Sequence, residues 1–335
     1  MVSELRRRPR MVAVVLLLLA SAIWGSTFVV VKQTIIHTPV LDFLAWRFIL
    51  AGLLLTVLRP RALVRLGRRG WRHGVLLGAA LAGGYMAQTF GLEHTPAAVS
   101  GFLTGLQVVF TPVIGWMVLR HQPGRRTWSA VAVATAGLAV MTLRGAPFGV
   151  GEALTIVSAA LFALQIVGLE RWTSTGNAYG LAAVELITIG AISLVAAAPS
   201  GVGLPQSPAI WGAVVLTAVA ATAFAFVVQT WAQSHLSATS AAVVFTTEPV
   251  FAAIFAWMSG ERLGWALVIG GALVVLAMLV MGVGGGDDEA APSTRAAPAP
   301  PALLAAPART AAANVREHDD ACDDDPQLDC GSVAV

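Results

Sequence analysis

Residues 11–31 read MVAVVLLLLASAIWGSTFVVV, an apolar run without a charged side chain. A helix of about 20 apolar residues crosses the roughly 30 Å hydrocarbon core of a bilayer and satisfies its own backbone hydrogen bonds there. The run is too long for the core of a secretory signal, and no clear small-residue cleavage site precedes the next apolar run. It therefore predicts a first transmembrane helix, which follows the basic cluster Arg6-Arg7-Arg8.

The composition of the whole chain agrees with a lipid environment. Charged residues make up only 12% of the 335 residues, whereas apolar residues make up 57% and the mean hydropathy is +0.76. A soluble globular chain usually carries about a quarter charged residues. The polar surface is too small to cover a water-exposed globule of this size, so we expect the lipid bilayer to surround most of the chain. No nucleic-acid partner is expected.

Ten apolar runs have the length and composition of membrane spans. They are Met11–Val31, Leu41–Leu58, Trp71–Phe90, Ala98–Leu119, Thr127–Leu143, Val150–Leu169, Ala178–Ala198, Ala209–Ala232, Ala238–Met258 and Trp265–Val283. The predicted fold is all-α and integral to the membrane, with ten transmembrane helices.

The basic residues predict the orientation of these helices. With the N-terminus inside, the inner segments hold fourteen of them: Arg6, Arg7, Arg8, Arg10, Arg59, Arg61, Arg65, Arg68, Arg69, Arg72, Arg120, Arg125, Arg126 and Arg171. The outer segments hold three: Lys32, Arg144 and Arg262. Loops that stay in the cytoplasm carry the excess of Lys and Arg. We therefore predict a multi-pass protein of the cytoplasmic (inner) membrane with both termini in the cytoplasm.

Four regions follow from the composition. Residues 1–10 form a basic cytoplasmic N-terminus, residues 11–143 the first five-helix repeat and residues 150–283 the second. Residues 284–335 are rich in Pro and Ala and then acidic, which predicts a disordered cytoplasmic tail. Both cysteines, Cys322 and Cys330, lie in this tail, so the hydrophobic body has no disulfide scaffold and no thiolate metal site.

The two halves of the hydrophobic body repeat one another. Gln88-Thr89 recurs as Gln229-Thr230 at an offset of 141, and Pro112 of the fourth run corresponds to Pro249 of the ninth at an offset of 137. Five helices are an odd number, so the second copy enters the membrane from the opposite side. Such an inverted repeat is typical of carriers, whose substrate site lies near the midplane between the copies.

Several stretches in this order resemble the EamA-like transporter family of the drug/metabolite transporter superfamily. They include Trp24-Gly25-Ser26, Ala45-Trp46-Arg47-Phe48 and Gln88-Thr89-Phe90-Gly91 in the first copy, and Glu248-Pro249 and Gly260-Glu261-Arg262-Leu263 in the second. The resemblance covers roughly residues 11–283. It implies a ten-helix, inverted-repeat carrier that exports or exchanges amino acids, metabolites or drugs, with proton coupling common but not universal. The chain departs from the pattern at His121-Gln122-Pro123, where the first copy often carries an acidic residue.

Polar side chains inside the predicted helices are the candidate site residues. A charge at the centre of a lipid-exposed helix costs about 2.5–3.5 kcal/mol on insertion scales, so such groups are expected to face a cavity or a neighbouring helix. The candidates for the substrate cavity or for coupling are Trp24, Arg47, Gln88, Gln107, Gln165, Glu185, Gln229 and Glu248.

Glu248 is the acidic residue closest to the middle of a predicted helix. Pro249 follows it and lacks an N–H, which frees the carbonyl of Phe245 and predicts a kink; Pro112 predicts a second kink in the fourth run. A free carbonyl beside a carboxyl group suits a cation or a substrate ammonium, and the carboxyl can exchange a proton. A structural glutamate that stabilises the kink is the alternative.

Arg47 and Glu185 occupy equivalent positions in the two copies. Arg47 either attracts anions or is tied to backbone or to Asp42. The four glutamines suit a zwitterionic or hydroxylated substrate, or else interhelical hydrogen bonds. Trp24 is either an aromatic cavity wall for cations or a packing residue.

The sequence carries no enzyme signature, no P-loop and no His, Cys or carboxylate cluster at metal spacing, so we expect neither an enzyme nor a metal or cofactor. The preferred function is a secondary-active transporter of small molecules that alternates access between the two sides of the membrane. The sequence leaves open whether transport is coupled to protons and whether the chain forms a homodimer. A membrane sensor or scaffold with a signalling tail, and a lipid-handling protein, are the alternatives.

Overall fold

The computed structural model describes residues 2–119, 148–245 and 247–282, together with isolated residues between 124 and 140. Most of the fifth predicted helix, Thr127–Leu143, and the whole predicted tail, 284–335, lie outside the described residues. The structure therefore does not address those two predictions.

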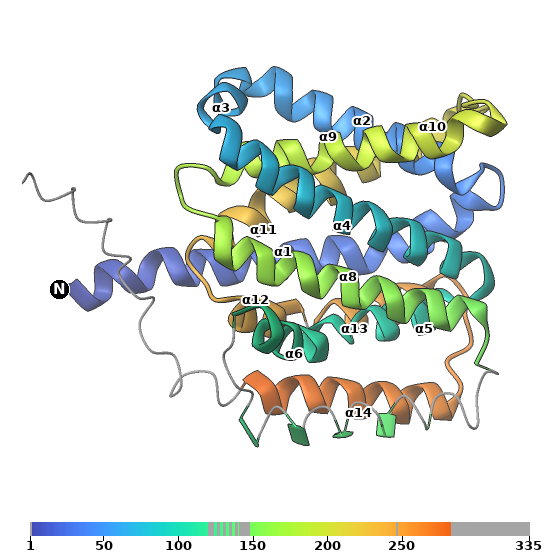
Figure 1. Cartoon of the computed structure of the whole chain (residues 1–335). Coiled ribbons are helices and arrows are strands. Elements are labelled where there is room, and N and C mark those ends of the chain that lie inside the picture. The colour runs from blue at the N-terminus through green and yellow to red at the C-terminus, as the bar shows by residue number, and fades with distance from the viewer. Residues whose placement is uncertain are drawn as a thin grey trace, which may run out of the picture. The chain divides into compact units, whose positions relative to one another are not determined.

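Every regular element in the described part of the chain is a helix (Figure 1). The α-helices are α1 (Val2–Ile35), α2 (Val40–Leu58), α3 (Pro60–Arg65), α4 (Gly67–His94), α5 (Ala97–Thr104), α6 (Gln107–Leu119), α8 (Val150–Trp172), α9 (Ala178–Ala197), α10 (Pro208–Leu216), α11 (Ala225–Gln233), α12 (Ala238–Phe245), α13 (Glu248–Met258) and α14 (Trp265–Gly282). A short 3-10 helix, η1 (Ala198–Ser200), follows α9, and a π-helix, η2 (Thr217–Phe224), joins α10 to α11.

Seven helical stretches in the described residues are long and apolar enough to cross a membrane: Pro9–Ile35, Val40–Leu58, Gly67–His94, Ala97–Val118, Val150–Trp172, Ala178–Ser200 and Pro208–Gln233. The helices Glu248–Met258 and Trp265–Ala277 are apolar but shorter. The predicted multi-pass, all-helical membrane fold is confirmed. The count of ten spans stays a prediction.

The fourth and ninth predicted helices are each divided in two. Gly105 and Leu106 form a turn between α5 and α6, in which Leu106 N–H donates to the carbonyl of Leu103 three residues back, at 3.1 Å. Before the start of α13, Thr247 N–H likewise donates to the carbonyl of Val244 three residues back, at 3.2 Å. Three-residue bonds of this kind tighten the helix end and interrupt the α-helical ladder.

The two divided helices follow one pattern. The starts of α5 and α12 are residues 97 and 238, their ends are 104 and 245, and α6 and α13 start at 107 and 248, so each pair differs by 141. Their directions are opposite, because α5–α6 runs from right to left in Figure 1 and α12–α13 from left to right.

The prolines lie at different points of the two divisions. Pro249 stands in the first turn of α13, where its missing N–H removes no intrahelical bond. Pro112 lies inside α6, beyond the turn that separates α5 from α6. The interruption of the fourth span is therefore at Gly105 and Leu106 rather than at the predicted kink residue Pro112.

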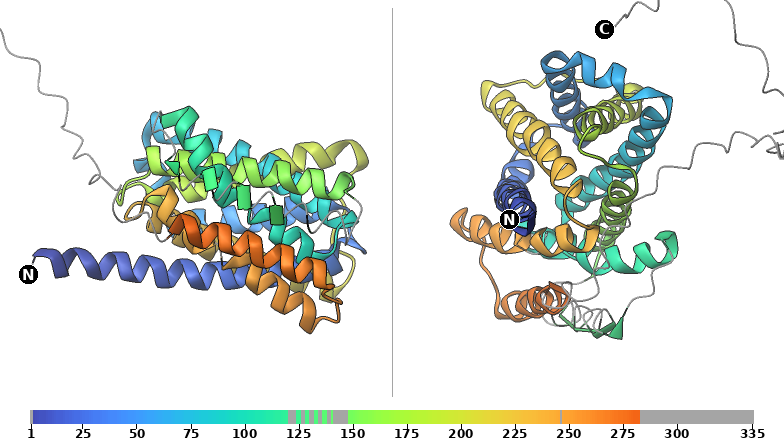
Figure 2. Two further views of the ribbon diagram at one scale, coloured as in Figure 1. Left: turned by 90° about the horizontal axis from the view of Figure 1, so that it is seen from below. Right: turned by 90° about the vertical axis from the view of Figure 1, so that its left-hand side faces the viewer.

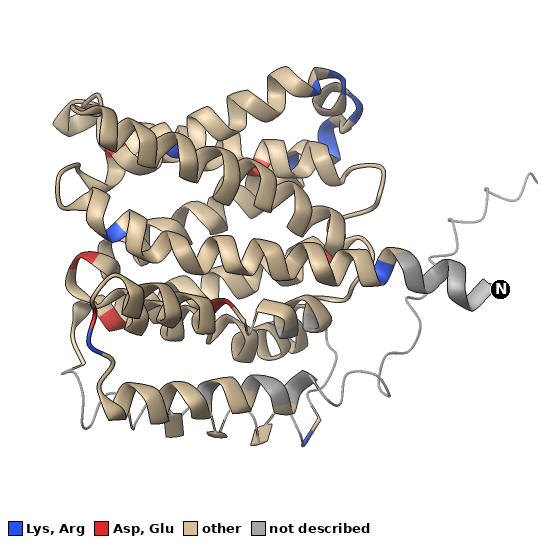
Figure 3. Cartoon of the chain, turned by 180° about the vertical axis from the view of Figure 1, so that it is seen from behind, with Lys and Arg blue, Asp and Glu red and all other residues tan. Residues whose placement is uncertain are grey.

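Small residues allow the other helices to pack closely against one another. A Cβ atom added at Gly78 of α4 would lie only 2.6 Å from Cβ of Thr188 and 2.8 Å from the carbonyl oxygen of Glu185, both on α9. Helix α4 packs against both α8 and α9, and α9 packs against α2 (Figure 2). Among the residues that the structure describes, Lys and Arg gather around α3 (Figure 3). This framework positions the polar side chains described next.

Candidate functional site

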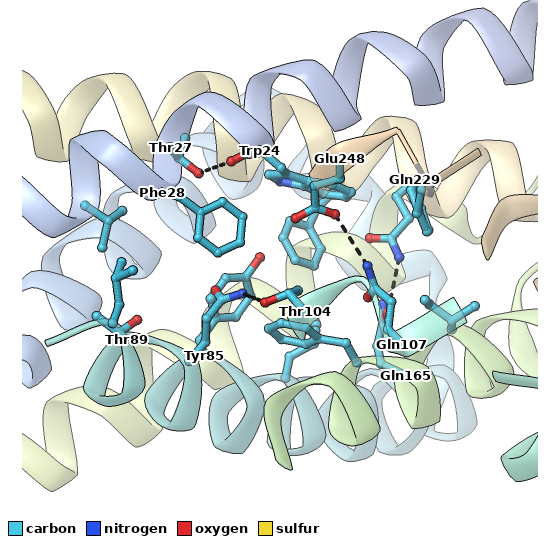
Figure 4. Close-up of a pocket in the computed structure, with 18 of the residues that line it drawn as sticks. Trp24, Thr27, Phe28, Tyr85, Thr89, Thr104, Gln107, Gln165, Gln229 and Glu248 are labelled. Carbon is cyan, nitrogen blue, oxygen red and sulfur yellow. Dashed lines mark hydrogen bonds between the residues drawn. The ribbon is translucent and has the colours of Figure 1, made fainter. Parts of the chain in front are cut away.

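One cavity collects seven of the eight predicted site residues. Trp24, Arg47, Gln88, Gln107, Gln165, Gln229 and Glu248 all line it, although they come from helices far apart in the sequence (Figure 4). The eighth, Glu185, lies behind the wall: it is fully buried and accepts a hydrogen bond from Gln165 Nε2 at 2.9 Å.

Glu248 and Gln107 join the two divided helices at the cavity. Each is the first residue of the second half-helix, α13 or α6, and Gln107 Nε2 donates to Glu248 Oε2 at 3.4 Å (Figure 4). Both side chains are buried, with exposed fractions of 6% and 5%. The start of each half-helix therefore contacts its counterpart at the offset of 141. At the end of α5, Gln88 Nε2 of α4 donates to Thr104 Oγ1 at 3.0 Å.

A row of amides connects the cavity with Glu185. Gln229 Nε2 of α11 donates to Gln165 Oε1 of α8 at 3.2 Å and also lies 3.2 Å from Gln233 Oε1. Gln165 in turn donates to Glu185 Oε2, while Glu185 Oε1 has no hydrogen-bond partner within the described structure. Because amides both donate and accept, the row satisfies polar groups that lipid could not.

Arg47 is held by a neutral partner. Its Nε donates to Thr222 Oγ1 of the π-helix η2 at 2.8 Å, and its Cζ lies 5.2 Å from the ring centroid of Phe48 and 5.3 Å from that of Tyr85. The alternative tie to Asp42 is not formed: Asp42 Oδ2 accepts from Gly203 N–H at 3.2 Å, and its Oδ1 has no hydrogen-bond partner among the described residues. A direct pair with Glu185 is not formed either.

Trp24 belongs to the cavity wall. Its Nε1 donates to the carbonyl of Ala221 in η2 at 2.7 Å, and its ring lies 5.8 Å from Phe226 and 5.6 Å from Phe245 between centroids. A π-helix takes up an extra residue per turn and is often found at functional sites. Here η2 supplies the partners of both Trp24 and Arg47.

Sequence reasoning missed the remaining aromatic residues of the wall. Tyr85 lies 5.1 Å from Phe162 and 6.1 Å from Phe226 between ring centroids, and all three line the cavity. Such rings bury large apolar areas and favour contact with an apolar or aromatic ligand. The cavity therefore combines an apolar wall with one guanidinium, one carboxyl group and several amides.

Carboxylates from other elements hold the far ends of the divided helices. Glu261 Oε1 and Oε2 accept from the N–H groups of Ala97 and Ala98 at the start of α5, at 3.0 and 3.2 Å. Glu170 Oε2 accepts from Ala238 N–H at the start of α12, at 3.2 Å. A negative charge at a helix N-terminus is favourable because of the exposed N–H groups and the helix dipole. The first halves, α5 and α12, are thus each held at their start and reach the cavity at their end, with Thr104 and Phe245.

No group of three or more His, Cys, Asp or Glu side chains in the described residues could hold a metal ion. The departure at His121-Gln122-Pro123 lies outside the described residues.

Several membrane-spanning helices around a buried polar cavity are features typical of membrane transporters. The profile of the EamA-like transporter family matches residues 11–143 and again 149–283, which together make up most of the chain. The chain belongs to this family, and it is a membrane transporter.

Several relatives of this chain are also described as transporters. An uncharacterized transporter of Archaeoglobus fulgidus is 29% identical over 268 residues, which cover 79% of this chain and 84% of the relative. The uncharacterized transporter YyaM of Bacillus subtilis is 22% identical over 79% of this chain and 92% of its own. A solved structure titled only as the crystal structure of a protein matches the fold with a TM-score of 0.63, at 17% identity, over 81% of this chain and 96% of that one.

Proposed function

We propose that the chain is a secondary-active carrier that exports or exchanges small metabolites, amino acids or drug-like compounds by alternating access. The observation that carries the proposal is the contact of Gln107 with Glu248, where two divided helices of opposite direction meet at one buried cavity. Half-helices in corresponding positions of two repeats are a recurrent way to build the substrate site of a carrier.

Alternating access follows from the way in which these helices are held. In this proposal residues 11–143 and 150–283 are two five-helix repeats of inverted orientation. They rock against one another while the ends of α5 and α12 that reach the cavity move. The carboxylates of Glu261 and Glu170 keep the other ends anchored. A proton on Glu248 is the proposed coupling ion.

Flux in proteoliposomes tests the carrier. We expect saturable uptake of at least one compound from a panel of amino acids, nucleosides, organic acids and organic cations, with and without a pH difference. Liposomes without protein serve as the control. A membrane sensor or scaffold would give no saturable flux with any of them, and a lipid-handling protein would instead move labelled lipid between the leaflets.

The orientation is tested separately. Since the inner segments carry most of the arginines, we expect a reporter that is active only in the cytoplasm to work when it is fused after Gly286 and to be silent when it is fused after Ser207. Expression of both fusions is compared by immunoblot. The opposite pattern of activity would contradict the proposed orientation.

A further inference from the structure

Arg47 is a buried cation that has no carboxylate partner among the residues that the structure describes. Its side chain is 3% exposed and lines the cavity, and its Nε is engaged by Thr222. In the part of the chain that the structure describes, its two terminal nitrogens have no hydrogen-bond partner, and no carboxylate oxygen lies within 4.0 Å of the guanidinium.

An unpaired guanidinium away from water is unfavourable because it loses its hydration. Cation–π contacts with the rings of Phe48 and Tyr85 offset part of this desolvation cost. The part of the desolvation cost that these contacts do not offset favours binding of an anion at the two terminal nitrogens. Because these nitrogens form one edge of a planar fork, they match the two oxygens of a carboxylate.

The charge of that anion is restricted by the rest of the wall. Arg47 is the one Lys, Arg or His among the cavity-lining residues of the described structure, and Glu248 is the one acidic residue. A single guanidinium neutralises a single negative charge. A dianion such as a phosphate monoester would keep a net negative charge in a cavity that already holds a carboxyl group, and this is unfavourable at low dielectric.

The neighbours of Arg47 restrict the chemistry of the rest of the bound substrate. The ring of Tyr85, which contacts the guanidinium, also contacts the rings of Phe162 and Phe226, and all three line the cavity. We propose that Arg47 forms a carboxylate-binding subsite, and that the substrate is a small organic monoanion whose apolar body lies against these three rings. This inference rests on the proposed carrier function and names the substrate class of its cavity.

Calorimetric titration of the purified protein tests the subsite without transport. The probes are 3-phenylpropanoate and its uncharged amide, 3-phenylpropanamide, with benzoate and indole-3-acetate and their amides as smaller and larger pairs. A hydrogen bond to a charged group is strong enough that we expect an acid to bind about 10- to 100-fold more tightly than its amide in at least one pair. Arg47→Gln should remove this preference, because it weakens binding of the acid far more than binding of the amide.

The matched control is Arg59→Gln. Arg59 ends the same helix and lies over the ring of Tyr179, outside the cavity, so its loss should keep the preference for the acid. Thr222→Val is a second variant for the case in which Arg47→Gln fails to fold. It removes the acceptor of Arg47 Nε and should weaken binding of the acid several-fold but not binding of the amide.

Two results would overturn the subsite: no preference for any acid in the wild type, or an unchanged preference in Arg47→Gln. Binding of an acid without any flux would refute the carrier and leave the subsite intact. Saturable flux of neutral or cationic compounds, with no preference for a carboxylate, would support the carrier and refute the subsite.

Discussion

Glu248→Gln should abolish accumulation of substrate that is driven by a pH difference. One proton per substrate and one pH unit provide 1.36 kcal/mol, which limits accumulation to about tenfold, and we expect the variant to fall to a ratio of about 1. Gln retains the shape of the side chain and still accepts a hydrogen bond from Gln107. It cannot carry a proton as the cavity changes sides, so exchange of substrate for substrate should persist.

The measurement is uptake into proteoliposomes with the lumen buffered one pH unit from the medium, followed by counterflow without a gradient. Glu93→Gln is the matched control, because Glu93 is an exposed carboxylate on α4 outside the cavity. Gradient-driven accumulation at the wild-type level in Glu248→Gln would remove Glu248 from coupling. Equal loss of accumulation and counterflow would point to a structural glutamate.

The sequence was sufficient to predict the membrane fold and most of the polar cavity wall. Apolar length decides where a chain can cross lipid, so the long runs became helices close to their predicted bounds. Lipid also excludes charges and amides, and this drives residues such as Arg47, Gln165 and Glu248 to one interior cavity. That reasoning depends on residue type alone and needs no knowledge of helix packing.

Apart from Trp24, the aromatic residues of the wall were not predicted, because aromatic residues are common in membrane helices, whether they face lipid or a cavity. The repeat offset could have identified some of these aromatic residues. Applied to the cavity residues, an offset of 141 pairs Tyr85 with Phe226, Thr104 with Phe245, and Gln107 with Glu248. These positions line the cavity in both halves, which is expected if the copies share one fold.

Two features depend on packing that residue type does not encode. The fourth and ninth spans read as continuous apolar runs, yet each is divided near the cavity, at Gly105 in one case and just before Glu248 in the other. The partner of Arg47 is Thr222 of the π-helix η2, and a π-helix has no distinctive sequence pattern that would have revealed it.

Gly25→Ala should strongly destabilise the protein, because α1 approaches α13 at this residue with no room for a side chain. An added Cβ would lie 2.6 Å from Cβ of Phe251, 2.8 Å from the backbone nitrogen of Ala252 and 2.9 Å from the carbonyl oxygen of Glu248. Two of these three atoms are backbone, so the helices must separate rather than change a rotamer. Overpacking of this kind costs about 1–3 kcal/mol or more.

The effect extends to function, since Gly25 stands between Trp24, a cavity residue, and the first turn of α13, which carries Glu248. Gly212→Ala is the matched control. Gly212 is exposed in α10 with no atom within 4 Å of an added Cβ, and replacing a helical Gly by Ala there should stabilise the helix by about 0.5–1 kcal/mol. Thermal unfolding in detergent should show a lower transition for Gly25→Ala and an equal or higher one for Gly212→Ala. Wild-type stability in Gly25→Ala would mean that α1 and α13 do not meet at this distance.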